Sequence, residues 1–182
     1  MGSLAMAEGN SAIFNSGFEA CRFAYAFSGQ QYPLSVMAKI MQCVGIGSGR
    51  GLIGLDGAAV AGTVKRHVEA MPMPNPLLIA SRCELNFKIS RQYATLLVDS
   101  VMPALGTGGH HRHMVTALIC IYFRIPDKDG NKIKLSSLCD QFALSADTMT
   151  RRKSAIFRRL KEMESKAQGL IDDRLKDSGV VK

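Results

Sequence analysis

Apolar residues recur along this chain at intervals of three and four residues, which is the period of a helix with one buried face. Near the start, one helical face runs from Phe14 to Tyr25, and Gly29 ends the pattern. The period resumes over residues 32–44 and, after a glycine-rich segment, over residues 58–71. The first part of the chain is therefore expected to be a series of helices.

A run of prolines separates this series from the rest of the chain. Residues 72–76 read Pro-Met-Pro-Asn-Pro, which stops the preceding helix. Within this run, Asn75 followed by Pro76 is a favourable helix start, with a cap residue and then proline at the first helical position. We therefore expect an N-terminal helical region over residues 1–74 and a second helical domain over residues 75–182.

The second domain is also expected to be helical. The pattern predicts one helix over residues 77–86 and another over residues 91–102, the latter capped by Ser90. A strongly apolar stretch at residues 114–123 could form a buried helix or a strand, and we favour a helix because its apolar residues fit one helical face. The sequence therefore predicts a mainly all-α fold.

One segment leaves an alternative open. Asp129-Gly130 is a favourable hairpin turn, and the residues YFRI and KIKL on either side could pair as strands. A small β-hairpin near residues 121–135 is thus the main alternative to an entirely helical chain.

The C-terminal domain contains a helix-turn-helix pattern between residues 134 and 163. Apolar residues occupy one face of a short first helix at residues 135–142. The pattern breaks at residues 144–147, whose serine and aspartate are both good N-cap residues. It resumes on a new phase from Thr148 and continues to about Lys176.

The second helix of this motif is strongly basic, and no acidic residue lies between Thr148 and Lys161. A helix fits the major groove of DNA, where its N-terminal residues reach base edges. Arg158 and Arg159 lie about two turns further on, where phosphate contact is favoured. The residues expected to contact DNA are Ser145, Asp147, Thr148, Thr150, Arg151, Arg152, Lys153, Ser154, Arg158 and Arg159.

The overall charge agrees with such a partner. The 182 residues carry a formal net charge of +8 at pH 7. An excess of this size indicates a polyanionic partner, most often nucleic acid. A soluble basic protein without such a partner would have the same composition, so the charge supports the motif and does not replace it.

The cysteines and histidines predict neither a metal site nor disulfides. The five cysteines are far apart and form no Cys-x-x-Cys pair, so buried free thiols in a reducing cytosol are expected. The histidines just before the apolar stretch at 114–123 have no nearby cysteine or acid to complete a metal site; they are His110, His111 and His113.

The chain also shows no targeting or membrane segment. No apolar run reaches the roughly 18 residues that a membrane-spanning helix needs. The start lacks the basic and then apolar pattern of a secretory signal. A cytoplasmic location is therefore expected.

The segment from Phe142 to Glu164 resembles the DNA-reading head of sigma-factor region 4. The apolar residue, turn and late apolar pattern that recur in that family are matched here by Phe142, Leu144, Ser145, Met149, Ile156 and Leu160. Two positions depart from the pattern. Ala143 stands where many helix-turn-helix motifs have a turn glycine. Arg152 stands where an inward apolar residue is common, so either the helix is rotated or this side chain extends its charge to solvent.

The wider layout resembles the lambdoid phage late-gene antiterminator Q proteins of the small, zinc-free type. Those carry an apolar helix like residues 118–122, then the helix-turn-helix, then a closing helix such as residues 167–175 would form. The resemblance implies binding to double-stranded DNA near a late promoter, in the cytoplasm of a bacterial host cell. It also implies that host RNA polymerase and its sigma factor are partners of the N-terminal half. A homodimer is compatible with it, because helix-turn-helix proteins often read paired half-sites.

Two other functions fit the sequence. A simple helix-turn-helix repressor or sigma-like regulator would bind an operator and do no more. An enzyme that binds a small molecule or nucleotide cofactor would use the glycine-rich region Gly45–Gly62, in which residues 49–54 satisfy Gly-x-Gly-x-x-Gly. A dinucleotide site also needs a preceding strand and an acid about 20 residues further on, and the sequence has neither. We therefore expect a regulator that is not an enzyme and has no cofactor.

Overall fold

The computed structural model describes residues 12–29, 54–105 and 112–182, and these residues confirm the all-α fold. Their only β feature is an isolated parallel bridge between Phe14 and Val181. The helix expected over residues 32–44 lies outside the described residues. In chain order the elements are α1 (Gly17–Gly29), α3 (Gly54–Glu69), α4 (Asn75–Cys83), α5 (Phe87–Leu96), α6 (Val98–Val101), the 3-10 helix η1 (Met102–Leu105), α7 (Arg112–Phe123), α8 (Leu135–Phe142) and α9 (Ala146–Asp177).

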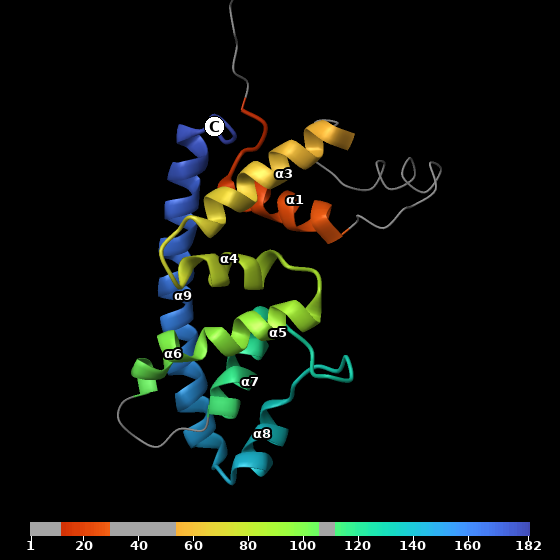
Figure 1. Ribbon diagram of the computed structural model, residues 1–182. Coiled ribbons are helices and arrows are strands. Elements are labelled where there is room, and N and C mark those ends of the chain that lie inside the picture. Colours follow the sequence, from red (N-terminus) through yellow and green to blue (C-terminus); the bar gives the residue numbers. More distant parts are fainter. Residues whose placement is uncertain (1–11, 30–53, 106–111) are drawn as a thin grey trace, which may run out of the picture.

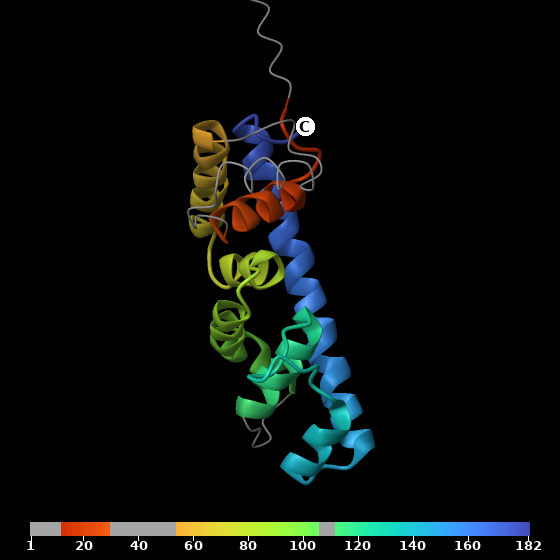
Figure 2. The same cartoon turned by 90° about the vertical axis from the view of Figure 1, so that its right-hand side faces the viewer.

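The long helix α9 is the element on which the others are assembled (Figure 1). Its 32 residues form one continuous helix, about 48 Å long at 1.5 Å per residue. Figures 1 and 2 show α1 and α3 beside its C-terminal half, α4 beside its middle, and α7 and α8 beside its N-terminal half. The closing helix expected at residues 167–175 is therefore the last part of α9 and not a separate element.

One hydrophobic core runs along the side of α9 that faces the other helices. The helix contributes fully buried apolar side chains at helical spacing, namely Met149, Ile156, Leu160, Ala167, Ile171 and Leu175. The same buried cluster includes Val64 of α3, Leu78 of α4 and Leu118 of α7. The proline-rich run ends α3, as expected. Residues 70–74 connect α3 to α4, the last two residues of the run begin α4, and the core continues across this connection.

The C-terminal end of α9 is tied to the residues that precede α1. The backbone N–H of Phe14 donates to the carbonyl of Val180 at 3.1 Å, and the N–H of Lys182 donates to the carbonyl of Phe14 at 3.2 Å. At the start of α1, the N–H of Gly17 donates to a carboxylate oxygen of Asp172 at 2.5 Å. A Cβ at Gly17 would lie 2.6 Å from that oxygen, so this close approach requires glycine.

The alternative of a hairpin at residues 121–135 is wrong. Its first expected strand is instead the end of α7, which continues to Phe123 and stops where Arg124 adopts a left-handed φ of 60°. The expected turn is present, because the carboxylate of Asp127 accepts backbone N–H groups two and four residues later at 3.0 and 2.7 Å. No strand ladder extends from this turn in the described residues, since the backbone groups of the first flank are used within a helix.

The bounds of the two helices expected over residues 77–86 and 91–102 are wrong. α4 ends at Cys83, and residues 87–105 are divided among α5, α6 and η1. Two of the expected helix starts also differ in their caps. α5 begins at Phe87, because Asn86 acts as its cap and accepts a backbone N–H of the first turn at 3.0 Å. Ser90, the expected cap, is buried inside this helix, and its hydroxyl donates to the carbonyl of Asn86 at 3.2 Å. α4 begins at Asn75 with Pro74 at the cap position, so no side chain caps it.

Candidate nucleic-acid interface

The helix-turn-helix expected from the sequence is present as α8, a three-residue turn at residues 143–145, and the start of α9. Leu138 of α8 and Met149 of α9 are both buried in this motif. Ala143 ends α8 in the left-handed region, with φ 50° and ψ 45°. The position at which many helix-turn-helix motifs have glycine is therefore left-handed here as well. Alanine in this conformation is strained, because its Cβ approaches the backbone.

Two of the expected DNA contacts hold the start of α9 in place. The hydroxyl oxygen of Ser145 accepts the backbone N–H of Thr148 at 3.2 Å, which makes Ser145 the N-cap. The same hydroxyl donates to the side-chain oxygen of Thr148 at 2.9 Å. Both hydroxyls are thus engaged with each other, and their role in this arrangement is to position the helix. Asp147 is exposed in the first turn, where a carboxylate favours helix formation but opposes an approaching phosphate.

A polar stripe runs along the face of α9 that is turned away from the core. It consists of Arg151, Ser154, Arg158 and Lys161, which follow one another at intervals of three, four and three residues and are all exposed. Residues at these spacings lie above one another on a helix. The buried stripe on the opposite side, which includes Ile156 and Leu160, fixes this orientation. We call these four residues the basic stripe.

Two of the remaining expected contacts lie beside the basic stripe and are partly covered. Arg152 is half-buried, and its guanidinium donates to the sulfur of Met114 in α7 at 3.4 Å. This residue therefore lies toward the core side and extends along α7, which explains how an arginine is accommodated where an apolar residue is common. Lys153 is also half-buried, with its ammonium 5.3 Å from the ring centre of Phe157. Thr150 and Arg159 are exposed.

The cations of residues 148–161 form no ion pair with an acid in the described part of the chain. The ion pairs formed by described residues join Arg82 to Glu164 and Arg112 to Asp99, and neither involves residues 148–161. Six cations thus share four turns of helix without neutralisation. Like charges this close repel one another, so an arrangement of this kind is stabilised when a polyanion binds.

A buried polar cluster fastens α9 just beyond the basic stripe. Glu164 accepts two hydrogen bonds from the guanidinium of Arg82 in α4, at 2.7 and 2.8 Å, and one from the hydroxyl of Tyr122 in α7, at 2.7 Å. The guanidinium also lies over the rings of Tyr122 and Phe123, 5.1 and 4.9 Å from their centres. Three helices that are far apart in sequence are therefore joined at one carboxylate.

Burial and hydrogen bonding act in opposite directions on this cluster. Burial by itself would raise the pKa of Glu164, but the hydrogen bonds from Arg82 and Tyr122 and the charge of Arg82 outweigh it and lower that pKa. Burial, followed by the hydrogen bond to Glu164, raises the pKa of Tyr122 to about 12. The carboxylate is thus held ionised and the phenol neutral, as a structural ion pair requires.

The sequence reasoning missed this cluster, although one signal for it was present. Glu164 stands directly beside Met163, in a helix whose other buried positions are apolar. A carboxylate that falls on the buried side of a helix needs a partner. The position of that partner, 82 residues earlier in the chain, has no signature in the local pattern.

The other candidate chemistries gain no support from the described residues. Cys21, Cys83 and Cys120 are buried free thiols, as expected, and burial raises the pKa of each, which disfavours the nucleophilic thiolate. No group of three metal-ligating side chains occurs in the described part of the chain. The glycine motif falls mostly outside those residues, and its last glycine, Gly54, is the first residue of α3. None of the described helices combines the length and apolar character needed to cross a membrane.

Comparison of the chain with models of known protein families, and with curated proteins, finds no match.

Proposed function

We propose that this protein binds double-stranded DNA with the N-terminal half of α9 and acts as a transcription regulator. The observation that carries the proposal is the basic stripe: three exposed cations and a serine, at helical spacing, on the side of a helix opposite the core. A helix placed with such a face in the major groove brings its cations against bases and phosphates. The same assignment is supported by the six cations of residues 148–161, none of which forms an ion pair with a described residue.

The residues of the basic stripe would contact different parts of the DNA, depending on their position along the helix. Arg151 lies one turn from the N-terminus of α9 and would read a base edge, where arginine pairs bidentately with guanine. Arg158 and Lys161 lie two to three turns further on and would contact phosphates, which give affinity without sequence preference. Ser154 lies between them and could contact either.

The more specific part of the proposal is late-gene antitermination with RNA polymerase and its sigma factor as partners. It rests on the resemblance of the chain's layout to the antiterminator Q proteins. The fold is compatible with it, because α1 and α3 pack near the far end of α9. From Arg151 to Asp172 the helix rises about 30 Å, so a protein partner could reach that end while DNA occupies the other.

DNA binding is tested first, by fluorescence anisotropy of labelled duplexes over a range of salt concentrations. If the three cations of the basic stripe each replace a phosphate counterion, the logarithm of the affinity falls with the logarithm of salt with a slope of about −2.7. Raising salt fourfold then weakens binding by about 40-fold. Lys166→Ala, a change of an exposed cation outside the stripe, is the matched control and leaves the slope unchanged. Binding that is absent, or that does not depend on salt, would contradict the proposal.

Antitermination is tested by single-round transcription in vitro across a terminator, on a template that carries the DNA flanking the gene. Readthrough that requires both the protein and an upstream element supports antitermination. Loss of initiation without readthrough supports a simple repressor instead. DNA binding without either effect would restrict the proposal to DNA recognition.

A further inference from the structure

Two large apolar side chains are exposed at the connection between α4 and α5. Leu85 is 62% exposed and Phe87 is 57% exposed, on either side of the cap residue Asn86. One exposed apolar side chain is ordinary on a protein surface. Two that line the same depression are a feature of surfaces that bind other molecules.

That depression is an open groove of about 650 Å³. One wall is the start of α5, and the other is the loop that connects α7 to α8. The guanidinium of Arg91 donates to the carbonyl of Pro126 and joins the two walls. The residues that line it are Leu85, Asn86, Phe87, Lys88, Arg91, Pro126, Asp127, Lys128 and Gly130.

The charges around the groove are mainly positive. Lys88 and Lys128 stand on opposite walls, both exposed, and neither forms an ion pair with a described residue. The acid of the groove, Asp127, uses one carboxylate oxygen to accept two backbone N–H groups of its own loop. The rim therefore offers two ammonium groups that no described acid neutralises, beside an apolar surface.

We propose that this groove binds an acidic peptide segment of a partner protein, with one large apolar side chain of that segment held against Leu85, Phe87 and Pro126. The carboxylates of the segment would pair with Lys88 and Lys128 on the two walls. Apolar contact supplies the anchor, and the opposite charges supply orientation and rate of association. A single-stranded nucleic acid fits less well, because Phe87 is the one aromatic residue among the described residues that line the groove and a strand needs a series of rings for stacking.

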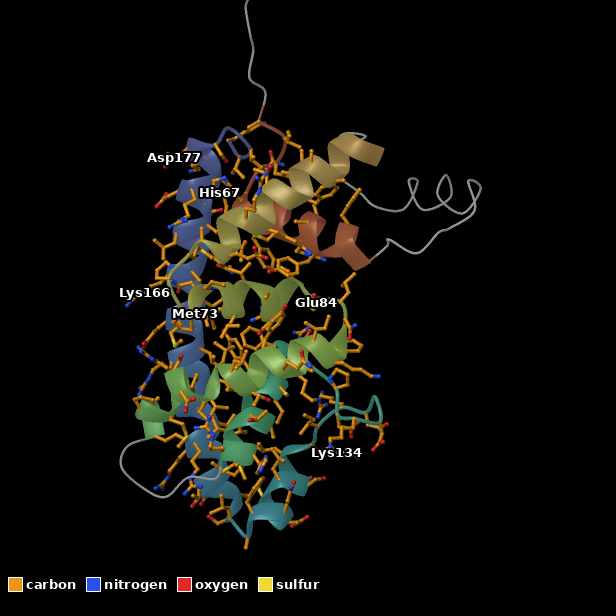
Figure 3. The ribbon with its side chains drawn as sticks, in the orientation of Figure 1. His67, Met73, Glu84, Lys134, Lys166 and Asp177 are labelled. Atoms are coloured by element: carbon orange, nitrogen blue, oxygen red, sulfur yellow. The ribbon has the colours of Figure 1, made fainter. Side chains whose placement is uncertain are left out.

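The groove lies on the side of the molecule away from α9. In Figure 3, Glu84 at the α4–α5 connection and Lys134 at the start of α8 are on this side, whereas Lys166 extends from the outer face of α9. The basic stripe faces away from the core and thus away from the groove. The segment and DNA can therefore be bound at the same time, and the two sites can be tested separately.

The test uses the full chain and a fluorescein-labelled peptide of about ten residues, with a central phenylalanine flanked by aspartate and glutamate. We expect saturable binding by anisotropy. Exchanging the central phenylalanine for alanine, or the acids for lysine, weakens it at least about tenfold. In the protein, Phe87→Ala and Lys128→Glu each cause a similar loss. The matched controls are Leu96→Ala, an equally exposed apolar residue of α5, and Lys132→Glu in the same loop, and both leave binding unchanged.

Three results would overturn this proposal. They are no saturable binding of the acidic peptide, equal binding by the Phe87→Ala variant, or preferential binding in the groove of a labelled single-stranded oligonucleotide. A duplex that occupies the basic stripe is expected to leave peptide binding unchanged, and displacement of the peptide would place the two sites on one surface. If the chain binds the peptide but no duplex, the DNA-binding function fails and the groove assignment stands.

Discussion

Residues 146–161 and residues 162–177 belong to one continuous helix, yet their charged side chains differ in sign and in surroundings. The first segment carries six cations and one carboxylate, whereas the second carries three cations and five carboxylates. The first packs against α7 and α8, and the basic stripe on its outer face is exposed. The second packs against α1, α3 and α4.

Two carboxylates of the second segment form hydrogen bonds that hold other helices against α9. Glu164 joins Arg82 and Tyr122, and Asp172 caps the start of α1 through the N–H of Gly17. The cations of the first segment have no such partners among the described residues. The comparison indicates that polar groups paired within the fold stabilise it, whereas a row of unpaired like charges is a feature of a ligand-binding surface.

Among the substitutions that test this comparison, Arg82→Ala is expected to have the largest effect on stability. The change leaves the carboxylate of Glu164 nearly buried without its cation, which we expect to cost about 3 kcal/mol of unfolding free energy. Urea denaturation followed by circular dichroism measures it. The double variant Arg82→Leu and Glu164→Leu should recover most of the loss, because no unpaired charge is then buried. A loss below about 1 kcal/mol in the single variant would mean that the pair contributes little.

The second prediction concerns the contact of α1 with α9. Gly17→Ala places a Cβ 2.6 Å from the Asp172 carboxylate and 3.2 Å from its backbone, so we expect a destabilisation of about 2 kcal/mol. Gly169→Ala in α9 is the matched change, since no atom lies within 4 Å of its Cβ. It should stabilise the protein by about 0.5–1 kcal/mol, because alanine favours a helix over glycine. Equal effects of the two changes would show that α1 is not held closely here.

The third prediction separates the two halves of α9 by DNA binding. Against a preferred duplex obtained by selection from random sequence, Arg151→Ala should lose about 1.5 kcal/mol, roughly tenfold, and relax the sequence preference. Arg158→Ala should weaken preferred and random duplexes alike, by a smaller factor, and make the salt slope shallower. Lys166→Ala and Lys176→Ala, in the other half, serve as controls. If these control variants lose as much affinity as Arg151→Ala, DNA affinity would depend on net charge and not on the basic stripe.

The smallest effect is expected at the turn of the helix-turn-helix. Ala143 has a positive φ, so Ala143→Gly should remove backbone strain and stabilise the protein by up to about 1 kcal/mol. The larger conformational entropy of glycine in the unfolded chain offsets part of this gain. Thermal unfolding measures the change, and DNA affinity should not alter. Ala143→Val, whose branched side chain tolerates a left-handed backbone poorly, should destabilise the motif and thus serves as the opposite control.

Most of the helix-turn-helix could be predicted from sequence, because its signals are local. The span of α8, the cap at Ser145 and the basic composition after Thr148 each depend on residues within one or two turns of one another. The hairpin alternative was wrong for a related reason. Asp129 and Gly130 indicated a turn correctly, but whether the flanking residues pair as strands depends on α7, whose helix uses their backbone groups first.

The orientation of the candidate DNA contacts could not be predicted in the same way. Composition placed ten residues in one set. The structure separates them into exposed residues, a pair of hydroxyls at the start of the helix, and two half-buried cations, of which Arg152 lies along α7 and Lys153 lies beside Phe157. Arg152 illustrates the difference, because only the position of Met114 shows where its guanidinium goes.

The sequence by itself determined that the described part of this chain is helical, roughly where most of its helices lie, and that one helix is strongly basic over its first half. Those properties follow from hydrogen bonds and side-chain spacing over a few residues. Tertiary structure alone decided that α9 is one unbroken support for the fold, that Glu164 meets Arg82 and Tyr122, and that Leu85 and Phe87 line a groove. These contacts join residues tens of positions apart, and their formation depends on how whole helices pack, which no local pattern encodes.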